Sequence, residues 1–441
     1  MKRLPAIVVV LCFLTSPVFS VQEAPSLTFP VSGFTLKNGL HVILAQDNSL
    51  PLVTVAIAYR VGSINESRGK TGLAHMLENL MFQGSRHIAP MQHVSFIHKI
   101  GGTMNAATTE DKTLFYQTIP SHQLVLALWL EADRMMSLRL ESSSIIRVKQ
   151  SLLDEIRNRK ERDPFLACSL YFDRMLFPDE SYHHPVFGKE SDIRMVTIED
   201  ARRFYSQYYG PNNAVLCISG SFDDDEIIPQ IKKYFETIPP IKQIPPPSIS
   251  VHENPPGGRE EIYEDYMIPL PGFYLGYRIA SPLHEDFYPL VLIEYILLHG
   301  MSSRLQSRLI RRERSAFRLS GGIDIKKDLA AFRIFVQNNN EATKELARRS
   351  IQSELNNMRN FPIPDREFDK IKSMFIADFI KQYYTSEDKA LRLINTYLLK
   401  NKIEDPSQEL AKYLAVTPAT IVGIMNRYFG RDQFSLDLKR K

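Results

Sequence analysis

Cysteine is scarce in this sequence, which has three in 441 residues. Cys12 lies in a segment that we expect to be removed, so Cys168 and Cys217 remain. Two cysteines cannot form the disulfide framework that holds small secreted domains together. They could pair in an oxidising compartment, but Cys217 lies in the apolar run AVLCIS, which is typical of a buried strand. We therefore expect two free, buried thiols.

Long apolar runs are missing after residue 20. Before that point, Lys2 and Arg3 precede the run LPAIVVVLCFLTSPVFS, which ends in a possible cleavage position after Ser20. This order is typical of a secretory signal peptide. No later stretch reaches the roughly 20 apolar residues that a membrane-spanning helix needs. The sequence therefore predicts a secreted or periplasmic protein with no membrane span.

Neither sign of charge is in strong excess. The formal net charge is +4, and it falls to +2 when Lys2 and Arg3 are removed with the signal peptide. The two signs are interspersed and no basic patch stands out, so we expect no nucleic-acid partner. With 44% hydrophobic residues, the composition is that of a globular protein that is too long for one compact core.

Apolar periodicity predicts an α+β organisation in two parts. Alternating apolar residues at 34–59 predict strands, and periods of 3.6 residues in SHQLVLALWLEADRMMSL and IIRVKQSLLDEIRNRKER predict amphipathic helices. Residues 239–258 contain seven prolines, which exclude a helix interior or a central strand and predict a semi-rigid linker. We therefore expect a signal peptide at 1–20, a first domain at 21–238 and a second domain at 259–441.

The two expected domains share a repeated segment. The two copies lie 220 residues apart, as VTIEDARRFYSQYYGPNNAVL at 196–216 and VTPATIVGIMNRYFGRDQFSL at 416–436. Each copy begins with Val-Thr, has an aromatic pair before a glycine and continues into an expected strand. The first copy opens with a capping-box pattern from Thr197 to Asp200. The repeat predicts a duplicated α+β domain rather than two unrelated domains.

The stretch TGLAHMLENLMFQG, which begins at Thr71, is the candidate functional motif. We expect a helix with Thr71 as its N-cap. Such a helix places His75, Glu78 and Asn79 on one face. A histidine and a carboxylate one turn apart can form half of a zinc site, with Glu78 as the base and Glu155 as a remote ligand. Spacing alone leaves open the alternative of a solvated polar face.

The segment GLAHMLENLMFQGS resembles the inverted zinc motif, H-x-x-E-H, of the pitrilysin and insulinase family, which includes the mitochondrial processing peptidases and their short bacterial relatives. The likeness continues in order through nearly the whole mature chain. It is carried by NGLHVILAQDNSLP, VGSINESRGKTGLAH, GGTMNAATTEDKTLFYQTIP, LEADRM, HHPVFGKESDI, FYSQYYGPNNAVLCISG and GMSSRLQSRL. The resemblance implies a fold of two homologous α+β halves that close like a clam around a large cleft.

The resemblance also implies a zinc site. His75 is then the first ligand, Glu155 the third ligand and Glu78 the general base that activates water. The position of the second ligand holds Asn79, where the family has histidine. A further glutamate of the family corresponds to Val148.

Other residues match positions that bind substrate in the family. An arginine and a tyrosine that hold the substrate carbonyl correspond to Ile310 and Phe317, although a small shift of register would bring Arg311 or Arg312 to the arginine position. Neither Ile310 nor Phe317 can donate a hydrogen bond from its side chain, and losing such a donor typically costs about 100- to 1,000-fold in rate. Asn105 would lie on the strand that receives extended peptide by β-augmentation, unless it is only a turn residue at a strand end.

Two hypotheses follow from these residues. In the first, the protein is a periplasmic zinc metallopeptidase-like subunit that acts on peptides or unfolded polypeptides, as a homodimer or as a heterodimer with a sister chain of the same family. Retention of His75, Glu78 and Glu155 favours it. In the second, it is a catalytically inactive binding or scaffold subunit of an active sister chain. Asn79, Val148, Ile310 and Phe317 favour this alternative.

Overall fold

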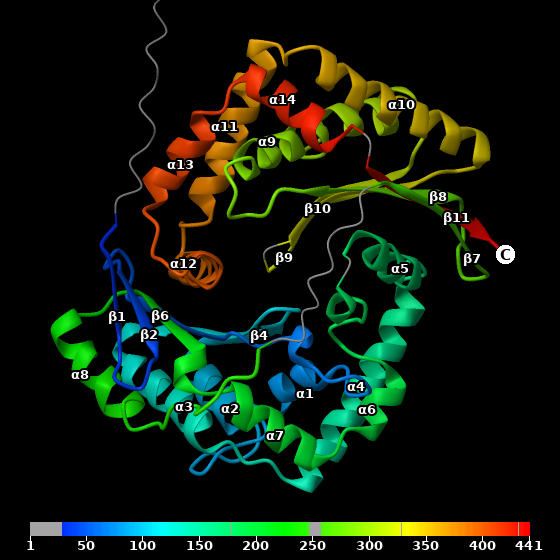
Figure 1. Cartoon of the computed structure of the whole chain (residues 1–441). Coiled ribbons are helices and arrows are strands. Elements are labelled where there is room, and N and C mark those ends of the chain that lie inside the picture. Colours follow the sequence, from blue (N-terminus) through cyan, green and yellow to red (C-terminus); the bar gives the residue numbers. More distant parts are fainter. Residues whose placement is uncertain (1–28, 178, 247–256, 328, 431) are drawn as a thin grey trace, which may run out of the picture.

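The computed structural model of this chain describes residues 29–177, 179–246, 257–327, 329–430 and 432–441. The expected signal peptide and the centre of the expected linker lie outside the described residues. Two mixed sheets, each with helices packed on it, confirm the α+β class and the two-part architecture (Figure 1). Within these ranges, we find no helix that is long and apolar enough to cross a membrane.

The first sheet has six strands in the order β1-β2-β6-β3-β5-β4. Its central strand β6 is buried along its whole length, whereas β4 lies at one edge and is partly exposed. The central position of β6 explains its continuous apolar sequence, because both faces are covered. The strands are β1 (Val31–Thr35), β2 (His41–Gln46), β3 (Leu52–Tyr59), β4 (Thr103–Thr108), β5 (Thr113–Pro120) and β6 (Ala214–Gly220).

The second sheet has five strands in the order β7-β11-β8-β10-β9. They are β7 (Arg259–Asp265), β8 (Gly272–Ile279), β9 (Arg318–Lys326), β10 (Leu329–Gln337) and β11 (Gln433–Arg440). Each sheet has one pair of parallel neighbours, β2 with β6 in the first sheet and β7 with β11 in the second. All other neighbouring strands in both sheets are antiparallel. The same order therefore recurs, and β9 has the edge position that β4 has in the first sheet.

The repeated sequence segments have equivalent places in the two halves. Helix α7 (Ile198–Tyr208) leads into β6, and α14 (Pro418–Tyr428) leads into β11. Thr197 and Thr417 are the N-caps of these helices, and each accepts a hydrogen bond from the amide three residues later. The capping box from Thr197 to Asp200 is present. The expected duplication is confirmed.

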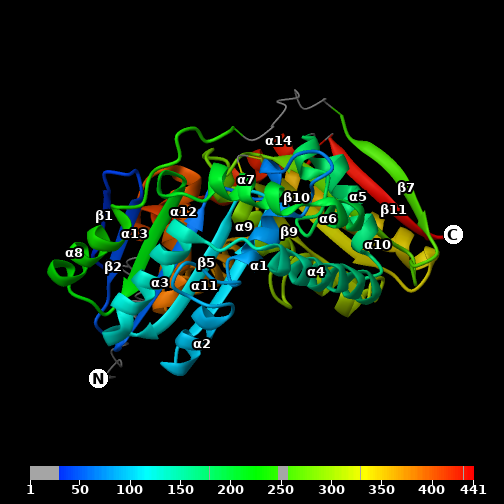
Figure 2. The same ribbon diagram turned by 90° about the horizontal axis from the view of Figure 1, so that it is seen from below.

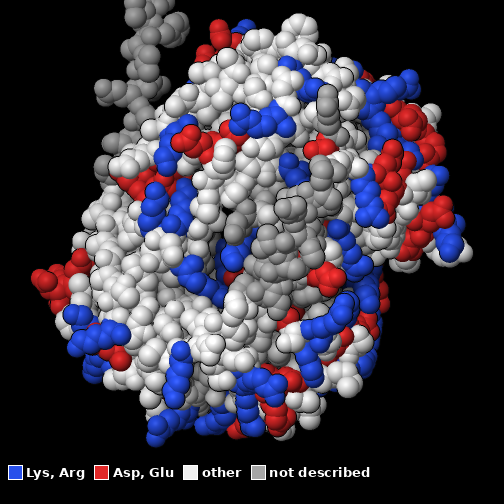
Figure 3. All heavy atoms as spheres, in the orientation of Figure 1, with Lys and Arg blue, Asp and Glu red and all other residues white. Residues whose placement is uncertain are grey.

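Helices cover the outer face of each sheet. In the first half they include α1 (Leu73–Leu80), α2 (Gln92–Lys99), α3 (Leu124–Ser137), α4 (Ser142–Arg162), α6 (Glu190–Met195) and α8 (Asp224–Phe235). In the second half they include α9 (Phe287–Leu297), α10 (Glu341–Asn360), α11 (Asp365–Lys381) and α13 (Pro406–Leu414), with a short π-helix at Gln306–Arg312. On the face shown in Figure 3, basic and acidic side chains are interspersed.

Each sheet is also packed against a helix from the other half. Helix α5 (Leu166–Leu176) contributes Cys168, Phe172 and Leu176 to an apolar cluster on β8, β10 and β11. Helix α12 (Ser386–Lys400) contributes Leu393 and Ile394 to a cluster on β2, β3 and β6. Figure 1 places α12 over the first sheet and α5 beneath the second sheet, and Figure 2 shows the same fold from below. The two halves therefore share their cores.

The two cysteines of the described chain are free and buried, as expected from the sequence. Cys168 packs in the cluster around α5, and Cys217 packs in the cluster around α12. Burial raises the pKa of the Cys168 thiol to about 12. Both thiols are therefore packing residues rather than reactive groups.

Candidate functional site

Helix α1 is held at its N-terminus by a buried carboxylate. Glu66 accepts hydrogen bonds from the backbone N–H of Gly72, at 2.7 Å, and of Ala74, at 2.8 Å. Gly72 is the N-cap, with a φ of 86°. The prediction of Thr71 as N-cap is wrong, because its hydroxyl donates to Asp192 at 2.8 Å instead. The free amides of the first turn are satisfied by Glu66 from outside the helix.

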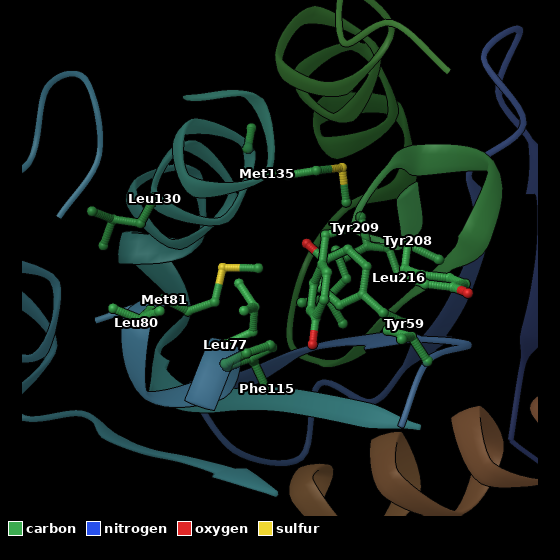
Figure 4. Close-up of a cluster of buried hydrophobic side chains, with 14 of the residues drawn as sticks. Tyr59, Leu77, Leu80, Met81, Phe115, Leu130, Met135, Tyr208, Tyr209 and Leu216 are labelled. Carbon is green, nitrogen blue, oxygen red and sulfur yellow. The ribbon is translucent and has the colours of Figure 1, made fainter. Parts of the chain in front are cut away.

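The apolar face of α1 fixes the direction of its polar face. Leu77 and Leu80 are fully buried and point into the core with Met81, where they meet Phe115 of β5 (Figure 4). Tyr59 and Tyr209 complete this cluster. The opposite face, with His75, Glu78 and Asn79, therefore turns toward α4 and the edge strand β4, with which α1 is in contact.

The predicted polar residues come together at this point. The Nε2 atom of His75 lies 3.9 Å from a carboxylate oxygen of Glu155 on α4. Glu78 accepts a hydrogen bond of 2.6 Å from the hydroxyl of Thr108 on β4. Burial raises the pKa of Glu78, the nearby Glu155 carboxylate adds to this, and the bond from Thr108 opposes it.

Glu155 is held by a second partner. Arg159, one turn later on α4, contacts the other carboxylate oxygen of Glu155 with Nε at 2.9 Å and Nη2 at 2.8 Å. The guanidinium also lies over the ring of Phe187, at 5.3 Å from its centroid. The third ligand position is therefore already engaged by a cation.

Asn79 turns its amide group toward its own helix. Its Nδ2 donates to the carbonyl oxygen of His75 at 3.0 Å. The Nδ1 atom of His75 is buried and has no hydrogen-bond partner in the part of the chain that the structure describes. Histidines that bind metals usually donate this second nitrogen to a carboxylate or carbonyl, which fixes the ring orientation.

This donor set does not fit a zinc ion. A catalytic zinc site needs three protein ligands, usually imidazoles and carboxylates. The site offers one imidazole, from His75, and one carboxylate, from Glu155, which is paired with Arg159. The amide oxygen of Asn79 is a weak, uncharged metal ligand. Val148 is buried among apolar side chains and adds no carboxylate. Among the described residues, no group of three or more His, Cys, Asp and Glu side chains is placed to hold a metal ion.

The predicted substrate-binding positions lie in both halves of the chain. Asn105 is an exposed residue of the edge strand β4, and its amide donates to the hydroxyl of Tyr116 at 3.2 Å. It is thus within a strand and not at a turn. In the second half, Ile310 packs on the core and Phe317 is 47% exposed. Arg311 and Arg312 are exposed.

Three residues of the site were not predicted from the sequence. Arg159 is four residues after Glu155 on a predicted helix, and this spacing is a readable signal for an ion pair. Glu66 and Thr108 carry no such signal, because their contacts with α1 depend on how loops and strands fold around it.

Comparisons with known proteins identify the family of this chain. Residues 41–171 match the family described as Insulinase (Peptidase family M16), and residues 195–375 match the Peptidase M16 inactive domain. The zinc protease PqqE of Helicobacter pylori is 29% identical over 398 residues, which cover 90% of this chain and 89% of that protein.

Two solved structures extend the comparison. The crystal structure of a protease from Helicobacter pylori has a TM-score of 0.87 at 28% identity. The match covers 93% of this chain and 100% of that protease chain. The periplasmic protease PqqL of Escherichia coli has a TM-score of 0.77 at 18% identity, and the match covers 94% of this chain but 48% of PqqL. One copy of the present fold thus corresponds to about half of PqqL.

Proposed function

The chain belongs to the insulinase family, peptidase family M16, and we propose that it is a peptide-binding member that has lost zinc-dependent hydrolysis. One observation carries this proposal. At the position of the second imidazole, Asn79 donates its amide to the backbone of its own helix. Relatives of this chain are named zinc proteases, whereas Asn79 departs from the H-x-x-E-H motif of the family at the second ligand.

Peptide binding needs fewer groups than hydrolysis. Edge strand β4 is paired on one side only, with β5, so its other side can accept an extended peptide. Asn105 stands exposed on this strand. The absence of hydrogen-bond donors in the side chains of Ile310 and Phe317 weakens stabilisation of an oxyanion but leaves strand pairing intact.

The test compares the protein with Asn79→His, and with Asn79→Gln as a matched control that keeps the amide. We expect no stoichiometric zinc and no peptide cleavage for the protein as it is, but binding of labelled extended peptides in fluorescence polarisation. Asn79→His should take up about one zinc ion per chain in elemental analysis, because two imidazoles and one carboxylate are then present and the ion can displace Arg159 from Glu155. Asn79→Gln should not.

A weakly active zinc peptidase is the second candidate. The 3.9 Å approach of His75 to Glu155 and the buried Glu78 beside them favour it. If the unmodified protein carried zinc and cleaved peptides, and Glu78→Gln abolished the cleavage, this second candidate would replace the first.

We also propose that the protein acts outside the cytoplasm and pairs with a second unit of the same family. The signal-peptide pattern at 1–20 supports the location, as does the description of PqqL as periplasmic. The 48% coverage of PqqL supports the pairing, because that chain has room for two such units. Cell fractionation tests the location. Light scattering of the protein, alone and mixed with sister chains, tests the pairing.

A further inference from the structure

A groove lies on the inner face of β9 and β10. The antiparallel register places Arg318 opposite Gln337 and Ser320 opposite Phe335. Phe335 packs in the cluster around α5, so this face of the sheet is directed at the first half. As the edge strand of its sheet, β9 is paired only with β10.

The opposite wall of the groove is the junction between α4 and α5. Asp163, Phe165 and Ser169 from this junction face the strands across a cavity of about 400 Å³. The ring of Phe335 lies 5.1 Å from Phe165 and 4.6 Å from Tyr274, and these aromatic rings form an apolar floor. The groove is therefore built from both halves.

The two arginines of this groove differ in their pairing. Arg333 is neutralised by Asp173 at 2.6 Å and by Asp324 at 2.9 Å. Arg318 is exposed and lies over the ring of Phe335, 5.6 Å from its centroid. Among the described residues, Arg318 has no carboxylate within ion-pair distance. It is the cation in this groove that is available to a ligand.

The remaining free charge of the groove is negative. Asp163 accepts the backbone N–H of Phe165 at 2.9 Å and forms no ion pair with a described residue. A second carboxylate next to the first one would be repelled by Asp163. Asp163 therefore opposes the binding of an anionic group beside it, and a carboxylate is favoured only next to Arg318.

The groove lies within reach of a peptide bound at edge strand β4, which is in contact with α1. Asp163 follows Glu155 by eight residues at the end of α4. At a rise of about 1.5 Å per residue, this corresponds to about 12 Å along the helix. An extended peptide covers about 3.3 Å per residue, so about four residues span that distance.

We propose that this groove is a specificity subsite for one acidic side chain, Asp or Glu, of the peptide held in the cleft, and that Arg318 binds its carboxylate. The inference rests on the proposed function that the cleft binds extended peptides. The guanidinium, fixed above Phe335, can form two parallel hydrogen bonds with a carboxylate. The aromatic floor accommodates the aliphatic part of that side chain.

The test uses pairs of labelled extended peptides. The two peptides of a pair differ at one position, which is Glu in one and Gln in the other, and this position is varied along the peptide from pair to pair. Fluorescence polarisation at low salt should give about tenfold or tighter binding for the Glu peptide at one position, as expected for a hydrogen bond to a charged group. The preference should shrink in high salt. Arg318→Gln should abolish it while binding of the Gln peptide is retained.

The matched control is Arg314→Gln, because Arg314 is also exposed but does not line the groove. It should keep the full Glu preference. Equal binding of both peptides at every position, or a preference that survives Arg318→Gln, would overturn the inference and leave the proposed function standing. If no peptide bound at all, the proposed function itself would fail and the subsite with it.

Discussion

Asn79 and Arg159 act on the same site from two helices. The amide of Asn79 satisfies a backbone carbonyl of α1, and Arg159 occupies the carboxylate of Glu155. Arg159 supplies the positive charge beside Glu155 that a metal ion would otherwise supply, and Asn79 has no imidazole to offer such an ion. Arg159 already balances the negative charge of Glu155, so the site needs no bound metal ion for that purpose.

At the level of residues, the sequence predicted which side chains meet but not how each is bonded. His75, Glu78 and Glu155 were predicted from helix spacing and family likeness, and they lie together. The direction of the Asn79 amide could not be predicted, because an amide on a helix can face its own backbone or a neighbour with a similar free energy.

The close approach of two glycines sets the position of the N-terminus of α1. A Cβ atom at Gly188, where φ is 79°, would lie 2.4 Å from the carbonyl oxygen of Thr71 and 2.6 Å from Cα of Gly72. We therefore predict that Gly188→Ala lowers the free energy of unfolding by about 1–3 kcal/mol for the clash, in addition to about 1 kcal/mol for the backbone conformation.

Gly69→Ala is the matched control, because Gly69 has the same φ of 79° and no atom within 4 Å of its added Cβ. It should show only the backbone contribution of about 1 kcal/mol. Urea denaturation of both variants measures the two effects. Equal losses would mean that contact with Gly72 does not hold α1 in place.

At the level of elements, the sequence repeat predicted which helix and strand occupy equivalent places in the two halves. The Val-Thr start, the aromatic pair and the following strand lie in α7–β6 and in α14–β11, in equivalent sheet positions. Local signals such as capping residues and turn glycines are sufficient to predict where such a helix begins and ends. The exchange of α5 and α12 between the halves was not predicted, because apolar periodicity shows that a helix face is buried but not which sheet buries it.

Helix α9 is packed against β9 through a buried carboxylate. Burial raises the pKa of Glu294 to about 7, and a hydrogen bond from the Ile323 backbone opposes this in part. A Cβ atom at Gly322 would lie 2.6 Å from this carboxylate. The free acid has a pKa near 4.5 in the unfolded chain, so between pH 4.5 and 7 the folded state holds more protons. Stability from this group is therefore lost as the pH rises through that range.

We predict that Glu294→Gln is more stable than the unmodified protein above pH 7, by up to about 3 kcal/mol, and that the difference disappears near pH 4.5. Thermal melts across this pH range measure the difference. Glu285→Gln, at an exposed position just before α9, is the control and should show no such pH dependence. A difference that stayed constant with pH would contradict a buried, titrating Glu294.

At the level of the whole molecule, the halves are joined by more than the linker. The turn between β4 and β5 meets the turn between β9 and β10, where the backbone N–H of Lys327 donates to Asp111 at 2.7 Å and Lys326 pairs with Glu110. Together with the exchanged helices, these contacts cross between the halves at several separate places. The halves are therefore joined at several places besides the chain connection.

The shared cores predict that the two halves unfold together. Ile394 of α12 is fully buried against the first sheet although it belongs to the second half of the sequence. Ile394→Ala should lower the free energy of unfolding by about 2–5 kcal/mol, and Leu346→Ala, at a 39% exposed position of α10, should change it little. Calorimetry should give one transition for the full chain, and hydrogen exchange in Ile394→Ala should rise in β3 and β6 as well as in α12. Two separate transitions, or exchange that rises only in the second half, would mean that the halves fold as independent domains and that α12 is a surface contact.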